Sequence, residues 1–169
     1  MKTTTRINVG LPIAGMLLAL AIGGPSPAEA QVQLSGSAQG QEKDDVQGNP
    51  PQRILVEGSL TGVASNLGPL TITYKLTVNL NPMAGPVGTA VGTAQLSTAN
   101  GDTISADVVG VGQTVAGTLN NIVEIYAITG GTGRFAGINS GIFIMKRLVD
   151  LAVGQTSGSF EGSLTFPAP

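Results

Sequence analysis

The chain has 169 residues, the length of one domain, and its 41% of hydrophobic residues supply enough apolar side chain for a core. It contains no cysteine and no histidine, which excludes disulfides, Ser-His-Asp and Cys-His catalytic centres, and the commonest metal ligand. The net charge of −2 argues against a nucleic-acid partner, because binding nucleic acid requires a basic surface. We therefore expect no metal, no cofactor and no nucleic acid.

The N-terminal residues have the features of an export signal. Lys2 and Arg6 precede an apolar stretch over residues 11–22, and Ala28-Glu29-Ala30 offers small residues for cleavage. The apolar stretch is too short for a membrane anchor. We therefore expect residues 1–30 to form a helical signal peptide that is removed after Ala30. The mature protein is then secreted or periplasmic, without a stable membrane anchor. The alternative is a buried N-terminal helix.

Residues 31–52 have the composition of a linker. They contain the charged run from Glu42 to Asp45 and the pair Pro50-Pro51, and they offer little that a core would bury. We predict a flexible linker here, followed by a barrel domain over residues 53–169. A short strand around Val32 and Leu34 is the alternative.

From Arg53 onward the hydrophobic pattern has a period of two, which is typical of half-buried strands. The clearest case runs from Leu70 to Leu80, where apolar residues alternate with threonine, lysine and asparagine. Pro82, Pro86 and the Asn100-Gly101 pair mark turns between strands. Seven strands are predicted, over 53–62, 70–80, 88–98, 103–111, 122–129, 137–149 and 154–166. An eighth is expected from 32–40 or 114–119.

Many short strands with short turns predict an all-β domain, either an antiparallel up-and-down β-barrel of eight strands or a sandwich. One repeated pentapeptide favours the closed barrel. The sequence Glu-Gly-Ser-Leu-Thr occurs at 57–61 and again at 161–165, although chance repetition in a Gly/Ser/Thr-rich chain is the alternative. We therefore predict that the strands carrying Gly58 and Gly162 pair and close the barrel.

A glycine-rich segment over residues 128–137 is the most distinctive motif. The spacing of Gly131, Gly133 and Ala136 matches a dinucleotide-binding fingerprint, but that fingerprint requires a helix where this chain predicts a strand. We expect a tight hairpin instead, with several glycines at positive φ, Phe135 plugging one end of the barrel and Arg134 at its rim. The predicted structural residues are Gly130, Gly131, Gly133, Arg134, Phe135 and Gly137.

The run from Thr129 to Gly137, with Asn100-Gly101-Asp102 upstream, resembles the allene oxide cyclase barrel-like family, and plant dirigent proteins carry a similar hairpin. The resemblance covers roughly residues 56–166. It implies an eight-stranded antiparallel barrel with an apolar cavity, a small hydrophobic ligand or substrate, and homo-oligomers. Asn66 stands where bacterial relatives are expected to carry histidine, so no role that rests on an imidazole is implied, and no site residue is carried over.

Few polar side chains are placed to act on a ligand. Tyr74 lies on the apolar face of its strand, which predicts a ring inside the barrel, either at a ligand site or as a core tyrosine with its hydroxyl satisfied at the rim. Glu124 and Tyr126 share a face whose direction the pattern leaves open. An inward Glu124 would have a raised pKa and act as a proton donor. A solvated carboxylate is the favoured interpretation, because glutamate is rarely buried unpaired.

Pairing Thr129 with Asn139 across the hairpin would put Glu124 opposite Ile144 and make Lys146 its diagonal neighbour on the same face. The predicted ligand-binding residues are therefore Tyr74, Glu124, Tyr126 and Lys146. From these features we expect a non-catalytic, secreted barrel that binds a small hydrophobic molecule or serves as an extracellular component. The alternative is an isomerase or cyclase that shapes an apolar substrate inside the barrel.

Overall fold

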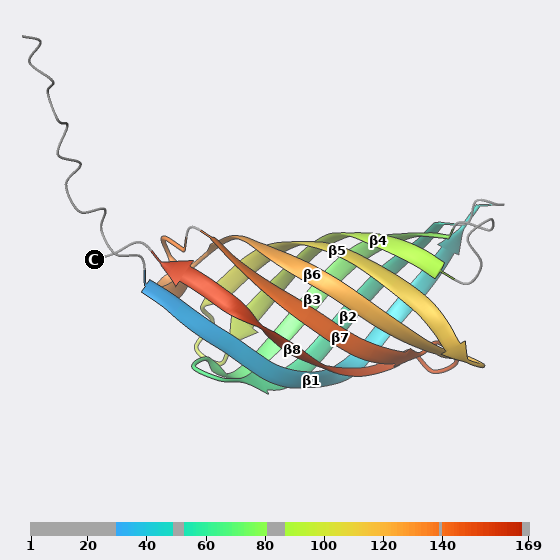
Figure 1. Cartoon of the computed structure of the whole chain (residues 1–169), viewed down its shortest axis with the longest axis horizontal. Helices are drawn as coiled ribbons and strands as arrows, with labels where there is room; N and C mark the ends of the chain where they lie inside the picture. The colour runs from blue at the N-terminus through green and yellow to red at the C-terminus, as the bar shows by residue number, and fades with distance from the viewer. Residues whose placement is uncertain (1–29, 49–52, 81–86, 139, 167–169) are drawn as a thin grey trace, which may run out of the picture.

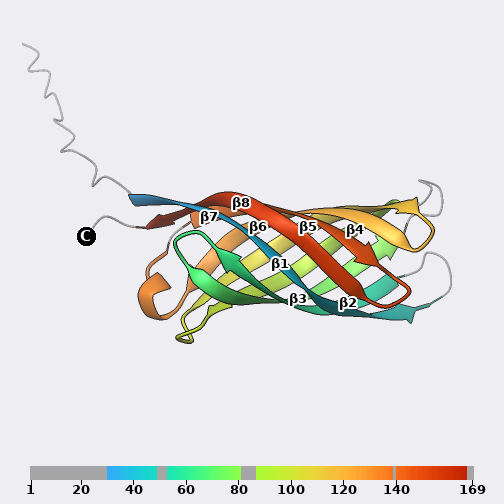
Figure 2. The ribbon, with the colours of Figure 1, turned by 90° about the horizontal axis from the view of Figure 1, so that it is seen from below.

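Eight antiparallel strands form a closed up-and-down barrel in the computed structural model, which describes residues 30–48, 53–80, 87–138 and 140–166 (Figures 1 and 2). The predicted fold class is thereby confirmed, while the predicted signal-peptide helix lies outside the described residues. The strands are β1 (Ala30–Gln47), β2 (Arg53–Ala64), β3 (Gly68–Leu80), β4 (Val87–Thr98), β5 (Thr103–Ala116), β6 (Leu119–Gly131), β7 (Ser140–Asp150) and β8 (Gln155–Phe166). Within the described ranges, no helix has the length and apolar character needed to cross a membrane.

The period of two places every second side chain inside the barrel. In β3, Leu70, Ile72, Tyr74 and Leu76 are buried, whereas the intervening Lys75 is exposed. Each β-strand directs successive side chains to opposite faces, so this alternation is what a barrel wall with an apolar inside requires. The pattern read from the sequence is thus the pattern of burial in the structure.

The position of β1 shows that two predictions were wrong, the linker over residues 31–52 and the strand pair that closes the barrel. Residues predicted as a linker form its 18-residue strand, so the barrel begins at Ala30 rather than at residue 53. β1 also lies between β2 and β8: Gly58 faces Glu42 of β1, and Gly162 faces Leu34 of β1. The two strands that carry the repeated pentapeptide therefore do not pair with each other, and the predicted closing interface was wrong.

Large interior side chains lie opposite glycines on the neighbouring strand. Tyr74 pairs with Gly58, and a Cβ atom added to Gly58 would collide with the Tyr74 ring. Arg147 pairs with Gly158, where an added Cβ would lie 2.6 Å from the Arg147 Cβ. The same relationship holds for Phe160 with Gly36, Phe143 with Gly162 and Glu124 with Gly110. Because the interior of an eight-stranded barrel is just wide enough to be filled by side chains, a large residue is accommodated where its cross-strand neighbour is glycine.

One end of the barrel, which we call the plugged end, is covered by the β6–β7 connection. A short 3-10 helix, η2 (Gly133–Phe135), directs Phe135 into the core with 3% of its surface exposed, and Ile138 is buried beside this turn. Arg134 lies at the rim, where its Nη2 donates to the Leu67 carbonyl at 3.1 Å. Gly133 and Gly137 have positive φ, as predicted, whereas Gly130 and Gly131 do not.

The opposite end carries the β5–β6 turn and the β7–β8 turn, whose Gly154 carbonyl accepts a hydrogen bond from the Glu42 amide. We call it the cluster end, after the group of polar side chains described next. The first residue of β1, Ala30, and the last residue of β8, Phe166, lie side by side at the plugged end (Figure 1).

Candidate functional site

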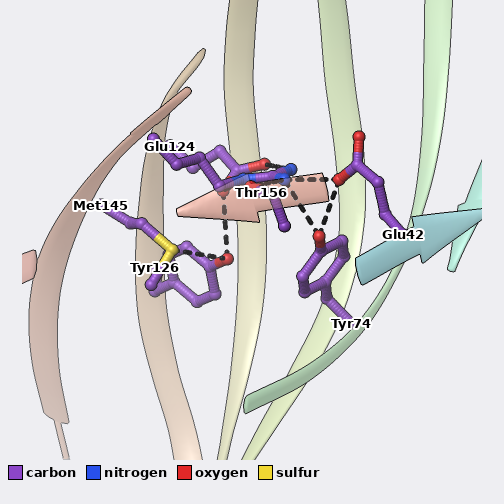
Figure 3. Close-up of polar contacts among 7 residues, drawn as sticks. Glu42, Tyr74, Glu124, Tyr126, Met145 and Thr156 are labelled. Carbon is purple, nitrogen blue, oxygen red and sulfur yellow. Dashed lines mark hydrogen bonds and ion pairs between the residues drawn. The ribbon is translucent and has the colours of Figure 1, made fainter. Parts of the chain in front are cut away.

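A buried ionic cluster lies inside the barrel toward the cluster end (Figure 3). Its centre is Arg147 of β7, whose neighbours Lys146 and Leu148 are exposed. The Arg147 guanidinium binds both oxygens of Glu124, with Nε to Oε2 at 3.1 Å and Nη2 to Oε1 at 2.8 Å. Nη1 forms a second ion pair with Glu42 Oε2 of β1. All three side chains are at most 3% exposed, so both ion pairs are shielded from water.

Two tyrosines and a threonine complete the cluster. Arg147 Nη1 also donates to the Tyr74 hydroxyl at 2.9 Å and to Thr156 Oγ1 at 3.2 Å. The Tyr74 hydroxyl donates to Glu42 Oε2 at 2.7 Å, and the Tyr126 hydroxyl donates to Glu124 Oε2 at 3.1 Å. Figure 3 shows each phenol against one carboxylate, Tyr74 beside Glu42 and Tyr126 beside Glu124. Each side chain of the cluster is therefore hydrogen-bonded to at least one other member.

Glycines make room for this cluster in the barrel wall. Gly58 lies directly opposite Glu42 on one side and Tyr74 on the other, which lets the phenol reach the carboxylate across the β2 backbone. Gly110 lies opposite Glu124, and a Cβ there would approach Glu124 Cγ to 2.7 Å. Side chains from β1, β3, β6 and β7 thus approach one another where β2 and β5 carry Gly58 and Gly110.

The environment fixes the protonation of the arginine and of the phenols. Burial lowers the pKa of Arg147, but the hydrogen bonds and negative charge of Glu124, with further negative charge from Glu42, raise it more, so that the group is a permanent cation. Burial raises the pKa of Tyr74, against a smaller opposing effect of the Arg147 charge. Burial followed by the Glu124 charge raises the pKa of Tyr126. Both phenols are therefore neutral hydrogen-bond donors at ordinary pH.

The cluster contains more negative than positive charge. Two carboxylates surround one guanidinium, and Asp44 occupies the next inward-facing position of β1 toward the cluster end. Burial raises the pKa of Asp44, the nearby negative charge of Glu42 raises it further, and Arg147 opposes both effects. Toward the plugged end, the described core beyond Tyr126 consists of apolar side chains apart from Thr98.

The structure brings together three of the four side chains predicted to bind a ligand. Tyr74, Glu124 and Tyr126 are all inside the barrel, and Glu124 is 0% exposed. The favoured prediction of a solvated Glu124 was wrong, because Arg147 supplies the buried partner that a buried carboxylate requires. Lys146 is not part of the group: it pairs with Val123 and points outward.

A register error explains the wrong choice of basic residue. Glu124 lies opposite Met145 rather than Ile144, and Ile144 lies opposite Ile125. The connection between β6 and β7 contains the η2 turn instead of a regular hairpin, so counting outward from it gave a register shifted by one residue, and such a shift exchanges the two faces. Asn139, on which the predicted register rested, lies outside the described residues.

Arg147, Glu42 and Thr156 were missed by sequence reasoning. Arg147 follows Phe143 and Met145 at a spacing of two, and all three are buried, so strict alternation along β7 was the available signal. Glu42 belongs to the segment taken as a linker, where the inward positions are occupied mostly by small or polar residues. No hydrophobic pattern was therefore there to reveal its orientation.

Beyond the cluster, the inward-facing positions become partly exposed. Ile54, Val78, Leu80 and Ile122 each occupy an inward-facing position and are only half-buried, and Gly112 of β5 lies opposite Ile122. A Cβ added to Gly112 would meet nothing closer than 3.5 Å. We call these four side chains the apolar ring. The cluster end thus presents partly exposed apolar side chains next to the buried polar cluster.

No protein-family model matches the chain, and no curated protein and no solved structure is significantly similar to it. Within the described part of the chain, no three aspartate or glutamate side chains converge in a way that could hold a metal ion. The functional argument therefore rests on the geometry of the cluster and of the apolar ring.

Proposed function

We propose that this chain is a secreted, non-catalytic β-barrel that binds a small hydrophobic molecule at the cluster end. The observation that carries the proposal is the apolar ring of Ile54, Val78, Leu80 and Ile122, half-buried side chains on inward-facing positions beyond the ionic cluster. The middle of the barrel is filled and Phe135 covers the other end, so this end is where a ligand has apolar contacts to gain. The resemblance to barrels that take small apolar ligands supports the same proposal.

The neutral fluorescent probe N-phenyl-1-naphthylamine tests binding. We expect a saturable increase of its emission with the wild-type protein and severalfold weaker binding by Val78→Thr, which keeps the shape of the side chain but adds a hydroxyl to the apolar ring. Val91→Thr is the matched control, because Val91 is the same residue type on the outer face, 52% exposed. Equal loss in both variants, or no saturable signal, would contradict the proposal.

Export is tested separately, by the intact mass of the protein recovered from a secreting host. Removal of residues 1–30 would leave Gln31 first, which preserves all of β1 except its initial residue. Retention of residues 1–30 in the recovered protein would contradict this part of the proposal without affecting ligand binding.

The inward position of Glu124 is the observation that favours the second candidate, an isomerase or cyclase. Its carboxylate is, however, engaged by Arg147 and Tyr126 and is 0% exposed, so it has no contact surface for a substrate in this arrangement. A bound alkene or epoxide recovered unchanged after prolonged incubation supports the binding function. Its rearrangement by the wild type, abolished in Glu124→Gln, would favour the enzyme.

A homo-oligomer is the partner that we propose for the outer surface. Val91, Val109, Ile125 and Ile144 are successive cross-strand neighbours on β4 to β7, and all four are exposed. Such a continuous apolar row is uncommon on the free surface of a monomer. Light scattering behind gel filtration should give a mass above that of one chain, and Ile125→Lys should reduce it. A monomeric wild type would contradict the proposal.

A further inference from the structure

The guanidinium of Arg147 has the appearance of an anion site but is already occupied. Its three nitrogens donate to oxygens of Glu42, Tyr74, Glu124 and Thr156, and the side chain is 2% exposed. A carboxylate or phosphate on a ligand would have to displace one of the two glutamates. The most basic group of the barrel interior therefore selects against an acidic ligand rather than for one.

Some acceptors of the same region, in contrast, have no donor within the described chain. The Glu42 side chain uses only Oε2 for its hydrogen bonds, and Figure 3 shows its other oxygen turned away from the Tyr74 hydroxyl. That oxygen has no donor among the described residues although the Glu42 side chain is only 3% exposed. Asp44 lies one inward position closer to the barrel end, where it is solvent-exposed and accepts no hydrogen bond from the described chain.

A third acceptor without a donor lies on β6. Asn120 occupies an inward position of β6, opposite the fully buried Val149, and its Oδ1 is buried without a hydrogen-bond partner in the described structure. An orphaned buried acceptor is unusual and calls for a donor from outside the chain. It is independent of the two carboxylates, because it lies on another strand and carries no charge.

We propose that the hydrophobic molecule bound at the cluster end is a primary amine, with its ammonium group held by Glu42 and Asp44 and its apolar body against the apolar ring. This inference rests on the proposed function and specifies its ligand. An ammonium group has three donors and one positive charge, which match unpartnered acceptors in a region with excess negative charge. A metal ion fits less well, since no three acidic groups of the described chain converge on one point.

Three molecules with the same eight-carbon chain test the charge preference directly: n-octylammonium, n-octanol and n-octanoate, titrated calorimetrically at neutral pH. We expect octylammonium to bind about tenfold more tightly than octanol, a difference of about 1.4 kcal/mol. Octanoate should bind more weakly than octanol, because its carboxylate meets carboxylates and an already satisfied guanidinium. The preference for octylammonium should decrease with added salt.

Two adjacent aspartates provide a matched pair of variants. Asp44→Asn removes the inward charge, whereas Asp45→Asn removes the same charge from the outward face of the same strand. We expect Asp44→Asn to lose most of the preference for octylammonium and to bind octanol as the wild type does. Asp45→Asn should retain the preference, which separates a specific contact from general attraction of cations by an acidic protein.

The outcomes distinguish the two levels of the proposal. Binding of N-phenyl-1-naphthylamine and octanol without a preference for octylammonium would overturn the amine inference and leave the binding function in place. Equal losses in Asp44→Asn and Asp45→Asn would overturn the assignment of the ammonium site. Absence of binding by the neutral probe and by all three octyl compounds would overturn both.

Discussion

Glu124 and Arg147 are diagonal neighbours on β6 and β7, and they share two hydrogen bonds of 3.1 and 2.8 Å inside the barrel. Both side chains are buried away from water. Their mutual attraction offsets the free-energy cost of desolvating the two charges only while both partners are present. The same guanidinium also holds Glu42. The stability of the cluster end therefore depends on one cation more strongly than on either anion.

Replacing that cation tests this dependence. Arg147→Met leaves two buried carboxylates without a counter-charge, and we expect the free energy of unfolding to fall by about 3–5 kcal/mol. Lys146→Met removes an exposed charge one residue earlier and should change it by less than about 0.5 kcal/mol. Urea unfolding of both variants gives the comparison. Similar small effects would show that the cluster is hydrated and weakly coupled.

The close approach at Gly58 gives a second prediction. A methyl group there would strike the Tyr74 ring, so Gly58→Ala should destabilise the fold by roughly 1–3 kcal/mol and displace the phenol from Glu42. Gly112→Ala is the control, since its nearest neighbour would be at 3.5 Å. It should be neutral or stabilising by roughly 0.4–1 kcal/mol, because it restricts the unfolded chain. Thermal melts that rank the two variants in the opposite order would disprove the packing argument.

The plugged end is tested by its own variants. Phe135→Ala should cost about 3–5 kcal/mol, because the ring is buried. Gly133→Ala should cost roughly 1–3 kcal/mol, since Gly133 has φ +60° and a Cβ there would strike the Asp102 carboxylate. Gly130→Ala adds an atom with nothing within 4 Å and should be tolerated. Chemical denaturation that shows Gly130→Ala as costly as Gly133→Ala would contradict this account.

The two tyrosines give a spectroscopic prediction, because they are the only ones in the chain and there is no tryptophan. Burial raises the pKa of both, so the folded protein keeps its phenol protons above about pH 10, where an unfolded chain loses them. Stability should therefore decrease as pH rises beyond that value. An ultraviolet titration should show phenolate only as the fold is lost. Reversible ionisation of one tyrosine in the folded state would show that its hydroxyl is accessible.

Removing the charge of Asp44 should stabilise the fold at neutral pH. Burial and the Glu42 charge raise its pKa above the ordinary value of 3.8, so between the two values the folded state binds more protons than the unfolded state. The contribution of Asp44 to stability consequently falls as pH rises through this range and stays unfavourable at neutral pH. Asp44→Asn should be more stable than the wild type at pH 7, and Asp45→Asn should not. Denaturant midpoints across acidic and neutral pH would reveal the difference, and a less stable Asp44→Asn would refute it.

The sequence was sufficient to predict the strands of the barrel wherever bulky apolar residues alternate with polar ones, as from Leu70 to Leu80. It was insufficient for β1, because the interior positions at Gly36 and Gly40 face Phe160 and Leu60 and have no space for a side chain of their own. A glycine facing a large residue is buried without being hydrophobic. Alternation of apolar residues therefore underestimates strands of this kind.

Sequence patterns predicted the site only where they fixed which side chains of a strand point inward. Tyr74 was placed inside by its neighbours, whereas Glu124 depended on a register that the η2 turn alters. The pairing of Glu124 with Arg147 and of Arg147 with Glu42 joins residues 23 and 105 positions apart. Contacts at such separations follow from barrel closure, which local patterns do not contain.

Closure of the barrel requires one strand interface between segments that are far apart in the sequence. Seven interfaces over the described chain join consecutive strands, whereas the last joins β1 to β8, with Ala30 beside Phe166. Contacts between distant residues form late because a long loop must close first, and until then β1 and β8 are open edges available to other chains. The Glu42–Arg147 ion pair forms across this seam. A partly folded chain consequently has an incomplete binding site, so ligand added during refolding should favour monomeric closure over intermolecular exchange of β1.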